Sequence, residues 1–135
     1  MQQRDILKDQ IEQLGKVLAK VLSDFLGLKA QGNVAQAVEM SNEKLQAELD
    51  INIEKLIALK EGDLSKYLTS RVYTDEHLEF LSEYLVELGK TKTTKLEVNS
   101  YLQKAIALLD LADEVSESVS FERMNKKSQT ENLLS

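Results

Sequence analysis

The sequence contains no cysteine, no proline and no tryptophan, and it has a single histidine among its 135 residues. Without cysteine the chain can form no disulfide, thiolate nucleophile or cysteine–metal bond. Because proline interrupts helices, a chain without proline can form long helices. The low aromatic content of 5% favours helix over strand. The composition therefore predicts an all-α fold.

Long apolar runs and a strong positive charge are also missing. No apolar run approaches the roughly 20 residues of a membrane span, and the first residues lack the basic-then-apolar pattern of a signal peptide. The net charge is −6, so phosphate backbones should repel the chain. We expect a soluble cytoplasmic protein that binds neither membrane nor nucleic acid. The basic residues Arg123, Lys126 and Lys127 are too sparse to change this, and we interpret them as part of a solvated end.

The N-terminal stretch 4–30 predicts a long helix around which the rest of the chain is organised. Apolar residues recur there in steps of 4 and 3, which is a heptad stripe along one helix face. The stripe consists of Leu7, Ile11, Leu14, Leu18, Val21, Phe25 and Leu28. Ile6, Val17 and Leu22 lie beside it, so the apolar face is wide enough for several neighbouring helices. If this flank is bare, it is a candidate partner-binding surface.

Further helices are predicted over 34–49, 51–60, 64–69, 75–88 and from 95 past 112. Gly32 and Asn33 should end the first helix and cap the second, Gly62 should end the third, and Asp63 should cap the fourth. The last helix carries a second heptad stripe, formed by Val98, Leu102, Ala105, Leu109, Ala112, Ser116 and Val119. We expect about five to six helices in a single domain over 1–122, with the last packed along the first. The polar tail 123–135 should fray.

Two hairpin segments resemble tetratricopeptide repeats. Gly32-x-Val34-x-x-Ala37 has the spacing at which that repeat places glycine, a bulky residue and alanine. Leu102-x-x-Ala105 matches part of it, with Thr93 in place of the glycine and Val98 in place of the small residue. More of the chain resembles an uncharacterised bacterial family of small, all-helical, tetratricopeptide-like proteins. That resemblance rests on Ile11-x-x-Leu14-Gly15-x-x-Leu18-Ala19, Gly32-Asn33, Gly62-Asp63-Leu64-x-x-Tyr67-Leu68 and Leu85-Val86-Glu87-Leu88-Gly89. It implies an array of antiparallel helical hairpins with long first and last helices, and it brings no activity or functional residues.

No motif predicts catalysis, a cofactor or a metal. His77 follows Asp75 and Glu76, but acidic residues are favoured at a helix start anyway, so we interpret His77 as a surface residue rather than a ligand. The carboxylates of Asp110, Asp113, Glu114 and Glu117 fall on one side of the last helix. They lack the pattern of a calcium loop. We interpret them as a solvated face, with a partner-binding patch as the alternative.

The leading hypothesis from the sequence is a non-catalytic module for protein–protein interaction or self-association. Tyr73, Tyr84 and Tyr101 are either core-edge residues with hydroxyls reaching water or interface anchors, and Tyr73 is the best anchor because it lies in a connector. The partner would be a protein, a peptide or a second copy. The alternative is a small-ligand-binding protein or enzyme with a pocket between hairpins, which requires an apolar cavity with a few buried polar groups.

Overall fold

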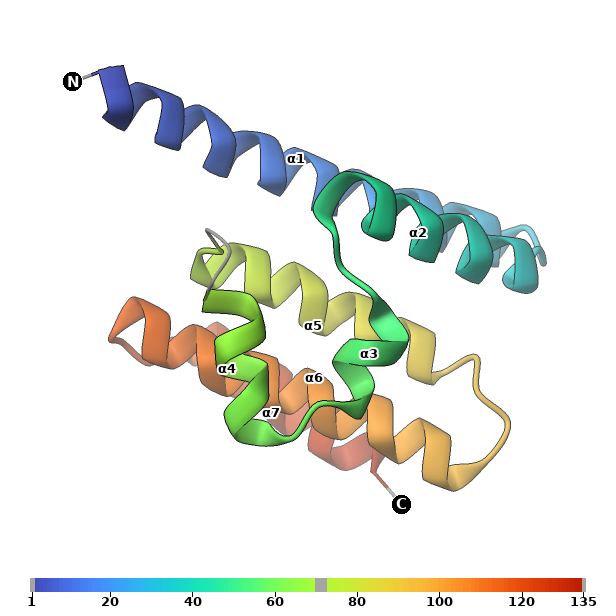
Figure 1. Ribbon diagram of the computed structural model, residues 1–135. Helices are drawn as coiled ribbons and strands as arrows, with labels where there is room; N and C mark the ends of the chain where they lie inside the picture. The colour runs from blue at the N-terminus through green and yellow to red at the C-terminus, as the bar shows by residue number, and fades with distance from the viewer. Residues whose placement is uncertain (1, 70–72, 135) are drawn as a thin grey trace. The chain divides into compact units, whose positions relative to one another are not determined.

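A computed structural model describes residues 2–69 and 73–134, and the side chains of 8–60, 62–68 and 73–134. Within these ranges the chain forms seven α-helices and no strand (Figure 1), which confirms the predicted all-α class. The chain divides into two compact units, an N-terminal unit, Met1–Leu56, and a C-terminal unit, Ile57–Ser135. In the part of the chain that is described, no helix is long and apolar enough to cross a membrane.

The N-terminal unit is built on α1 (Gln2–Ala30) and α2 (Val34–Leu49), which pack against each other and lie where the sequence predicted helices. Gly32 makes the tight turn with φ +85, a backbone conformation that glycine adopts without strain. Asn33 occupies the N-cap position of α2, but its side chain makes no capping hydrogen bond. The buried residues of α1 are all large and apolar, whereas α2 buries two small residues and two leucines. They are Leu18, Val21, Leu22 and Phe25 on α1 and Ala37, Ser41, Leu45 and Leu49 on α2.

The short helices after α2 differ from the prediction. Asp50 ends α2 in the left-handed region with φ 54, and α3 (Ile53–Ala58) then begins with the Asn52 side chain accepting the Lys55 N–H at 3.0 Å. The next helix, α4 (Glu61–Thr69), contains Gly62 and Asp63, so their predicted roles as terminator and cap are wrong. The physical reason is that the Lys60 carbonyl already accepts the N–H groups of Asp63 and Leu64, both at 3.0 Å.

The C-terminal unit is centred on α5 (Asp75–Gly89) and α6 (Lys95–Ser116), which pack against each other where helices were predicted. The predicted stripe ran on to Val119, but α6 ends at Ser116. Thr74 caps α5 and Thr94 caps α6, each by accepting a backbone N–H three residues on. The contact between the two helices is rich in leucine and includes the small residues Ser82 and Ala105. Ser82 Oγ donates to the carbonyl of Ala105 at 2.8 Å. Both residues are buried, Ser82 with 2% of its surface exposed and Ala105 with none.

The C-terminal tail is helical, so the predicted fraying is wrong. Helix α7 (Phe121–Leu133) follows α6 after a short connection and packs against it. Glu117 ends α6 in the left-handed region with φ 56, and Ser120 caps α7 by accepting the Arg123 N–H at 3.3 Å. The helix was not predicted because the composition of this segment is polar. Only Arg123 and Thr130 of α7 are buried, so the segment has no buried apolar stripe.

Gly89 lets α5 and α6 approach closely at the end of their hairpin. A Cβ at this position would lie 3.1 Å from the Tyr101 Cβ, whereas a Cβ at Gly27 would meet nothing within 4 Å. We expect Gly89→Ala to lower the free energy of unfolding by about 1 kcal/mol through overpacking. Gly27→Ala should raise it by about 0.5–1 kcal/mol through helix propensity. Urea unfolding of both variants tests this, and equal effects would contradict the close approach.

Candidate functional site

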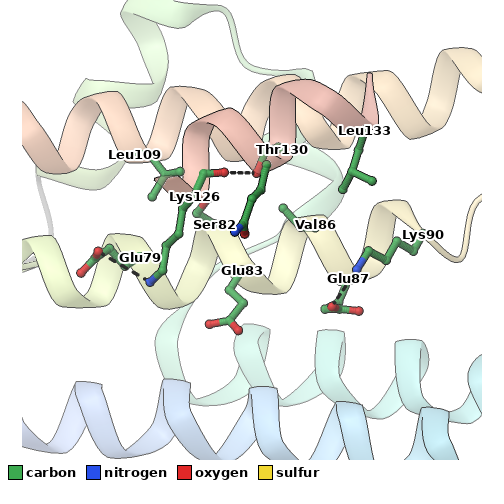
Figure 2. Close-up of a pocket in the computed structure, with 11 residues that line it drawn as sticks. Glu79, Ser82, Glu83, Val86, Glu87, Lys90, Leu109, Lys126, Thr130 and Leu133 are labelled. Atoms are coloured by element: carbon green, nitrogen blue, oxygen red, sulfur yellow. Dashed lines mark hydrogen bonds and ion pairs between the residues drawn. The ribbon is translucent and has the colours of Figure 1, made fainter. Parts of the chain in front are cut away.

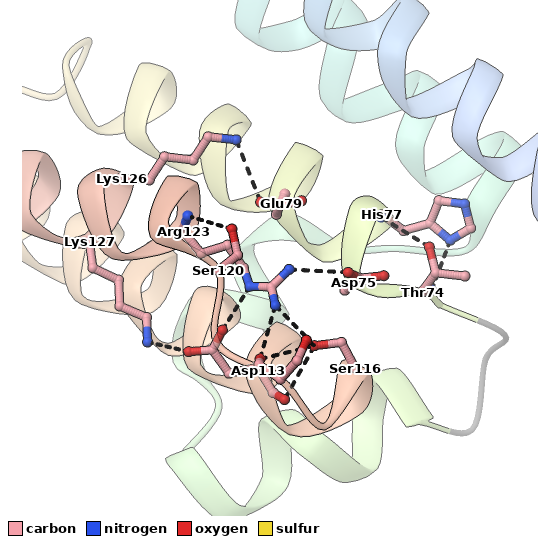
Figure 3. Close-up of polar contacts among 11 residues, drawn as sticks. Thr74, Asp75, His77, Glu79, Asp113, Ser116, Ser120, Arg123, Lys126 and Lys127 are labelled. Atoms are coloured by element: carbon pink, nitrogen blue, oxygen red, sulfur yellow. Dashed lines mark hydrogen bonds and ion pairs between the residues drawn. The ribbon is translucent and has the colours of Figure 1, made fainter.

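The most elaborate polar site in the C-terminal unit is the surface on which α7 lies. The docking surface consists of four carboxylates, Asp75 and Glu79 on α5 and Asp110 and Asp113 on α6. Three cationic residues of α7 meet it: Arg123, Lys126 and Lys127. Figure 3 shows the three cationic side chains of α7 beside Asp75, Glu79 and Asp113, which come from α5 and α6.

Arg123 is the centre of the site. Its guanidinium is 4% exposed and donates from Nε to Asp113 Oδ1 at 2.7 Å and from Nη1 to Asp75 Oδ2 at 3.1 Å (Figure 3). Nη2 donates to Ser116 Oγ at 2.9 Å and to the Ser118 carbonyl at 3.0 Å. A buried guanidinium is tolerated only when its donors are satisfied. One side chain therefore ties the start of α5, the end of α6 and the connection to α7.

The two lysines extend the contact along α7 with different burial. Lys127 Nζ lies 2.6 Å from Asp113 Oδ2 and 2.7 Å from Asp110 Oδ1, and its side chain is 21% exposed. Lys126 Nζ lies 3.7 Å from Glu79 Oε1, with 44% of its side chain exposed. Exposed pairs contribute little, typically less than about 1 kcal/mol. Asp113, which receives both Arg123 and Lys127, is therefore the main electrostatic anchor of α7.

The pKa values of these groups shift in the direction expected for ion pairs. Burial alone would raise the pKa of Asp113, but hydrogen bonds from Lys127 and Arg123 outweigh it and hold that pKa below its usual range. The hydrogen bond to Asp113 raises the pKa of Arg123 against the opposing effect of burial. Burial would lower the pKa of Lys127, yet hydrogen bonds to Asp110 and Asp113 raise it. All three groups are therefore charged at neutral pH.

The lowered pKa of Asp113 predicts acid sensitivity. The unfolded chain binds a proton at this carboxyl more readily than the folded chain, so its stabilising contribution is present above the ordinary pKa of about 3.9. It is lost as the pH falls through the lower, folded-state pKa. We expect the free energy of unfolding to fall more steeply on acidification in the wild type than in Asp113→Asn, measured by urea unfolding across a pH series. Parallel curves would contradict this coupling.

The sequence interpretation of both partners in this contact is corrected by the structure. Asp113 is not on a solvated face, since its side chain is only 15% exposed, and Arg123 is not in a solvated end. A signal was available: Arg123, Lys126 and Thr130 continue the 4,3 stepping of the preceding stripe beyond Val119. This stepping indicates that the chain beyond Val119 is helical, and opposite charges on two successive helices favour their pairing once the second helix is recognised.

A shallow groove runs between α5 and α7 (Figure 2). Its volume is about 230 Å³, below the roughly 300–1,000 Å³ of small-molecule sites. The lining is strongly charged and comprises Glu79, Ser82, Glu83, Val86, Glu87, Lys90, Leu109, Lys126, Gln129, Thr130 and Leu133. Its two buried hydroxyls serve the fold, because Ser82 donates to the Ala105 carbonyl and Thr130 to the Lys126 carbonyl at 2.7 Å. The groove has the character of a helix–helix seam.

A wider hollow of about 410 Å³ lies within the N-terminal unit, between α2 and α3. It is lined by Asn42, Glu43, Gln46, Ala47, Asn52, Ile53 and Glu54. Of these only Ile53 is buried, so a small molecule there would remain largely in water. Small-ligand sites usually bury most of the ligand surface.

The tyrosines and the α1 flank are distributed between core and surface. Tyr84 and Tyr101 are 2% and 9% exposed, so both side chains are buried. Leu22 is also buried, at 7%, and Val17 is half-buried. Tyr73 is half-buried, with its ring edge-on to His77 at 6.0 Å between centroids. The side chain of Ile6 lies outside the described residues. A binding role for these six residues stays a prediction.

His77 is not the surface residue that the sequence predicted. It is 3% exposed and completes a capping box with Thr74 (Figure 3). The Thr74 N–H donates to His77 Nδ1 at 3.1 Å, and the His77 N–H donates to Thr74 Oγ1 at 3.4 Å. Because Nδ1 accepts a hydrogen bond, it is the unprotonated ring nitrogen. The three-residue spacing from Thr74 was the overlooked signal, since a capping box joins the N-cap to the third helical residue.

Four large apolar side chains are exposed within ten residues at the end of α6, in the connection and at the start of α7. Val115, Val119, Phe121 and Met124 are 41%, 67%, 84% and 48% exposed, and together they are called the junction patch. Phe121 and Met124 lie three residues apart on α7 and so share a face. Isolated apolar residues are ordinary on a surface, whereas a group of them marks an interaction site.

Neither a metal site nor a similarity to known proteins indicates a function for these surfaces. Among the residues that the structure describes, no group of three or more histidines, aspartates or glutamates is arranged to hold a metal ion. Comparisons with protein-family models, curated proteins and solved structures give no match. The function must be inferred from the surfaces of the two units themselves.

Proposed function

We propose that this chain is a non-catalytic protein-interaction module that associates with a second copy of itself. The observation that carries the proposal is the junction patch. Its most exposed residue, Phe121, has 84% of its surface exposed. Two residues further on, Arg123 forms its ion pair with Asp113. An apolar group rimmed by polar residues has the composition of a protein interface, with an apolar centre and a polar rim. Closed apolar pockets would favour the small-ligand alternative, whereas the two hollows described above are open to solvent.

We also propose that the two hairpins belong to a tetratricopeptide-like array, as in the bacterial family that the sequence resembles. Support comes from the short turns of both hairpins and from the fully buried small residues Ala37 and Ala105, which let paired helices approach closely. A module of this kind presents helix faces to other helices, which agrees with an association role.

Light scattering during size-exclusion chromatography tests the association. We expect the wild type at micromolar concentration to show the mass of a dimer, and Phe121→Asp to shift it toward monomer because a charge cannot be buried in an apolar contact. Leu96→Asp is the matched control, since Leu96 is 80% exposed in the first turn of α6, at the opposite end of that helix. A monomeric wild type at every concentration would contradict self-association.

A further inference from the structure

The connection between α6 and α7 is short and begins with strained backbone. Residues 117–120 form the hinge, and Glu117 sits in the left-handed region with φ 56 and ψ 29. That region disfavours residues with a Cβ. If Glu117 returned to right-handed helical backbone, α6 and α7 could join into one continuous helix. A short, strained hinge of this kind favours exchange of the following element between copies.

The side chains that dock α7 keep the heptad register of α6 across the hinge. The α6 stripe includes the buried Leu102 and Leu109 and continues through Ser116 and Val119. Further steps of 4, 3, 4 and 3 reach Arg123, Lys126, Thr130 and Leu133. Arg123 and Thr130 are the buried residues of α7, while Lys126 and Leu133 line its groove. A continuous helix would therefore carry both sets on one face.

The charged contacts of α7 can be formed equally well with another copy. The ion pairs of Arg123, Lys126 and Lys127 all run to carboxylates on α5 and α6 (Figure 3). A second copy presents the same carboxylates in the same arrangement. Exchanging an identical element between copies has a low cost because the ion pairs with these carboxylates form again in the dimer.

We propose that two copies of this chain exchange α7, so that each α7 docks on α5 and α6 of its partner. This inference rests on the proposed self-association and specifies its structure. In the exchanged dimer each hinge straightens, and the two hinges lie near the twofold axis. Val119 and Phe121 of the two copies then come close together, which removes the exposed apolar surface of the junction patch from water.

Mixed cross-linking tests the exchange directly. Two versions of the full chain are co-refolded from urea, one carrying Glu79→Cys and the other Lys126→Cys, and are treated with a short bifunctional thiol reagent. The natural chain has no cysteine, so only the introduced thiols react. The wild-type side chains approach within 3.7 Å, so the sites are within reach of each other. We expect a covalent product of two chains joined through positions 79 and 126.

Two controls fix the interpretation. A single chain carrying both substitutions shows that the reagent spans the pair, and a mixture with Leu96→Cys in place of Glu79→Cys should give little product. A dimer mass without the 79–126 product would overturn the exchange and leave self-association standing. A monomer mass without the product would overturn both.

A hinge variant gives a second measurement that leaves the docking residues intact. Glycine adopts the left-handed region without strain, so Glu117→Gly stabilises the closed monomer and penalises the continuous helix. We expect the dimer dissociation constant to rise about tenfold or more, because both hinges of the dimer contribute. An unchanged dissociation constant would show that the hinge does not straighten on association and would overturn the proposal.

Discussion

Arg123→Met is expected to lower the free energy of unfolding of the C-terminal unit by about 3 kcal/mol, because removing one partner of a buried ion pair leaves the other charge uncompensated. Arg123 is 4% exposed, and its loss leaves Asp113 with Lys127 alone while Asp75 and the Ser118 carbonyl each lose a donor. Methionine nearly fills the aliphatic volume, so the effect reports on charge and hydrogen bonds. The measurement is the urea midpoint followed by circular dichroism.

Lys126→Met is the matched control for this prediction. It removes the same charge from the same helix, but its partner Glu79 is 3.7 Å away and its own side chain is 44% exposed. An exposed pair of this kind should contribute less than about 1 kcal/mol. If both variants lose the same stability, net charge on α7 would explain the effect and the Arg123 network would have no special role.

Ala105→Leu is expected to lower the free energy of unfolding by about 2–3 kcal/mol through overpacking. Ala105 is fully buried where α6 meets α5, and the Ser82 hydroxyl donates to its carbonyl at 2.8 Å. A larger side chain would push the helices apart and break this hydrogen bond. The prediction concerns the same small residue that carries the Leu102-x-x-Ala105 resemblance.

Ala107→Leu is the corresponding control, measured by the same urea unfolding. Ala107 is two residues further along α6 and only half-buried, so the added volume can extend toward solvent. We expect a change of about 0.5 kcal/mol or less, typical of surface substitutions. Equal losses in the two variants would show that α6 tolerates no added bulk in general and would contradict a specific close contact at Ala105.

The long helices could be predicted because their signals are local. The stripe containing Leu18 and Phe25 shows which face of α1 is buried, and Gly32 has the positive φ that a helix end requires. Thr74 and Thr94 lie at the caps of α5 and α6. Each of these signals depends on residues within one or two helical turns, where chain geometry alone decides which groups meet.

The candidate site was missed because its partners meet only after a second helix forms. Arg123 and Asp75 lie 48 positions apart in the sequence, and the composition of α7 resembles that of a solvated tail. Charge sequence alone does not show whether an aspartate is solvated or paired, since both are common on helices. His77 was misplaced for a related reason: its capping role needed Thr74 to be recognised as the first half of a reciprocal box.

The central claim is that α7 is a docked helix held by the Arg123 network, and native-state hydrogen exchange measures this most directly. In the wild type we expect the backbone N–H groups of 124–133 to be protected well above the level of an unfolded chain, because docking stabilises a helix too short to persist alone. In Arg123→Met this protection should fall strongly while that of α5 and α6 persists. Unprotected α7 amides in the wild type, or equal protection in both proteins, would contradict the claim.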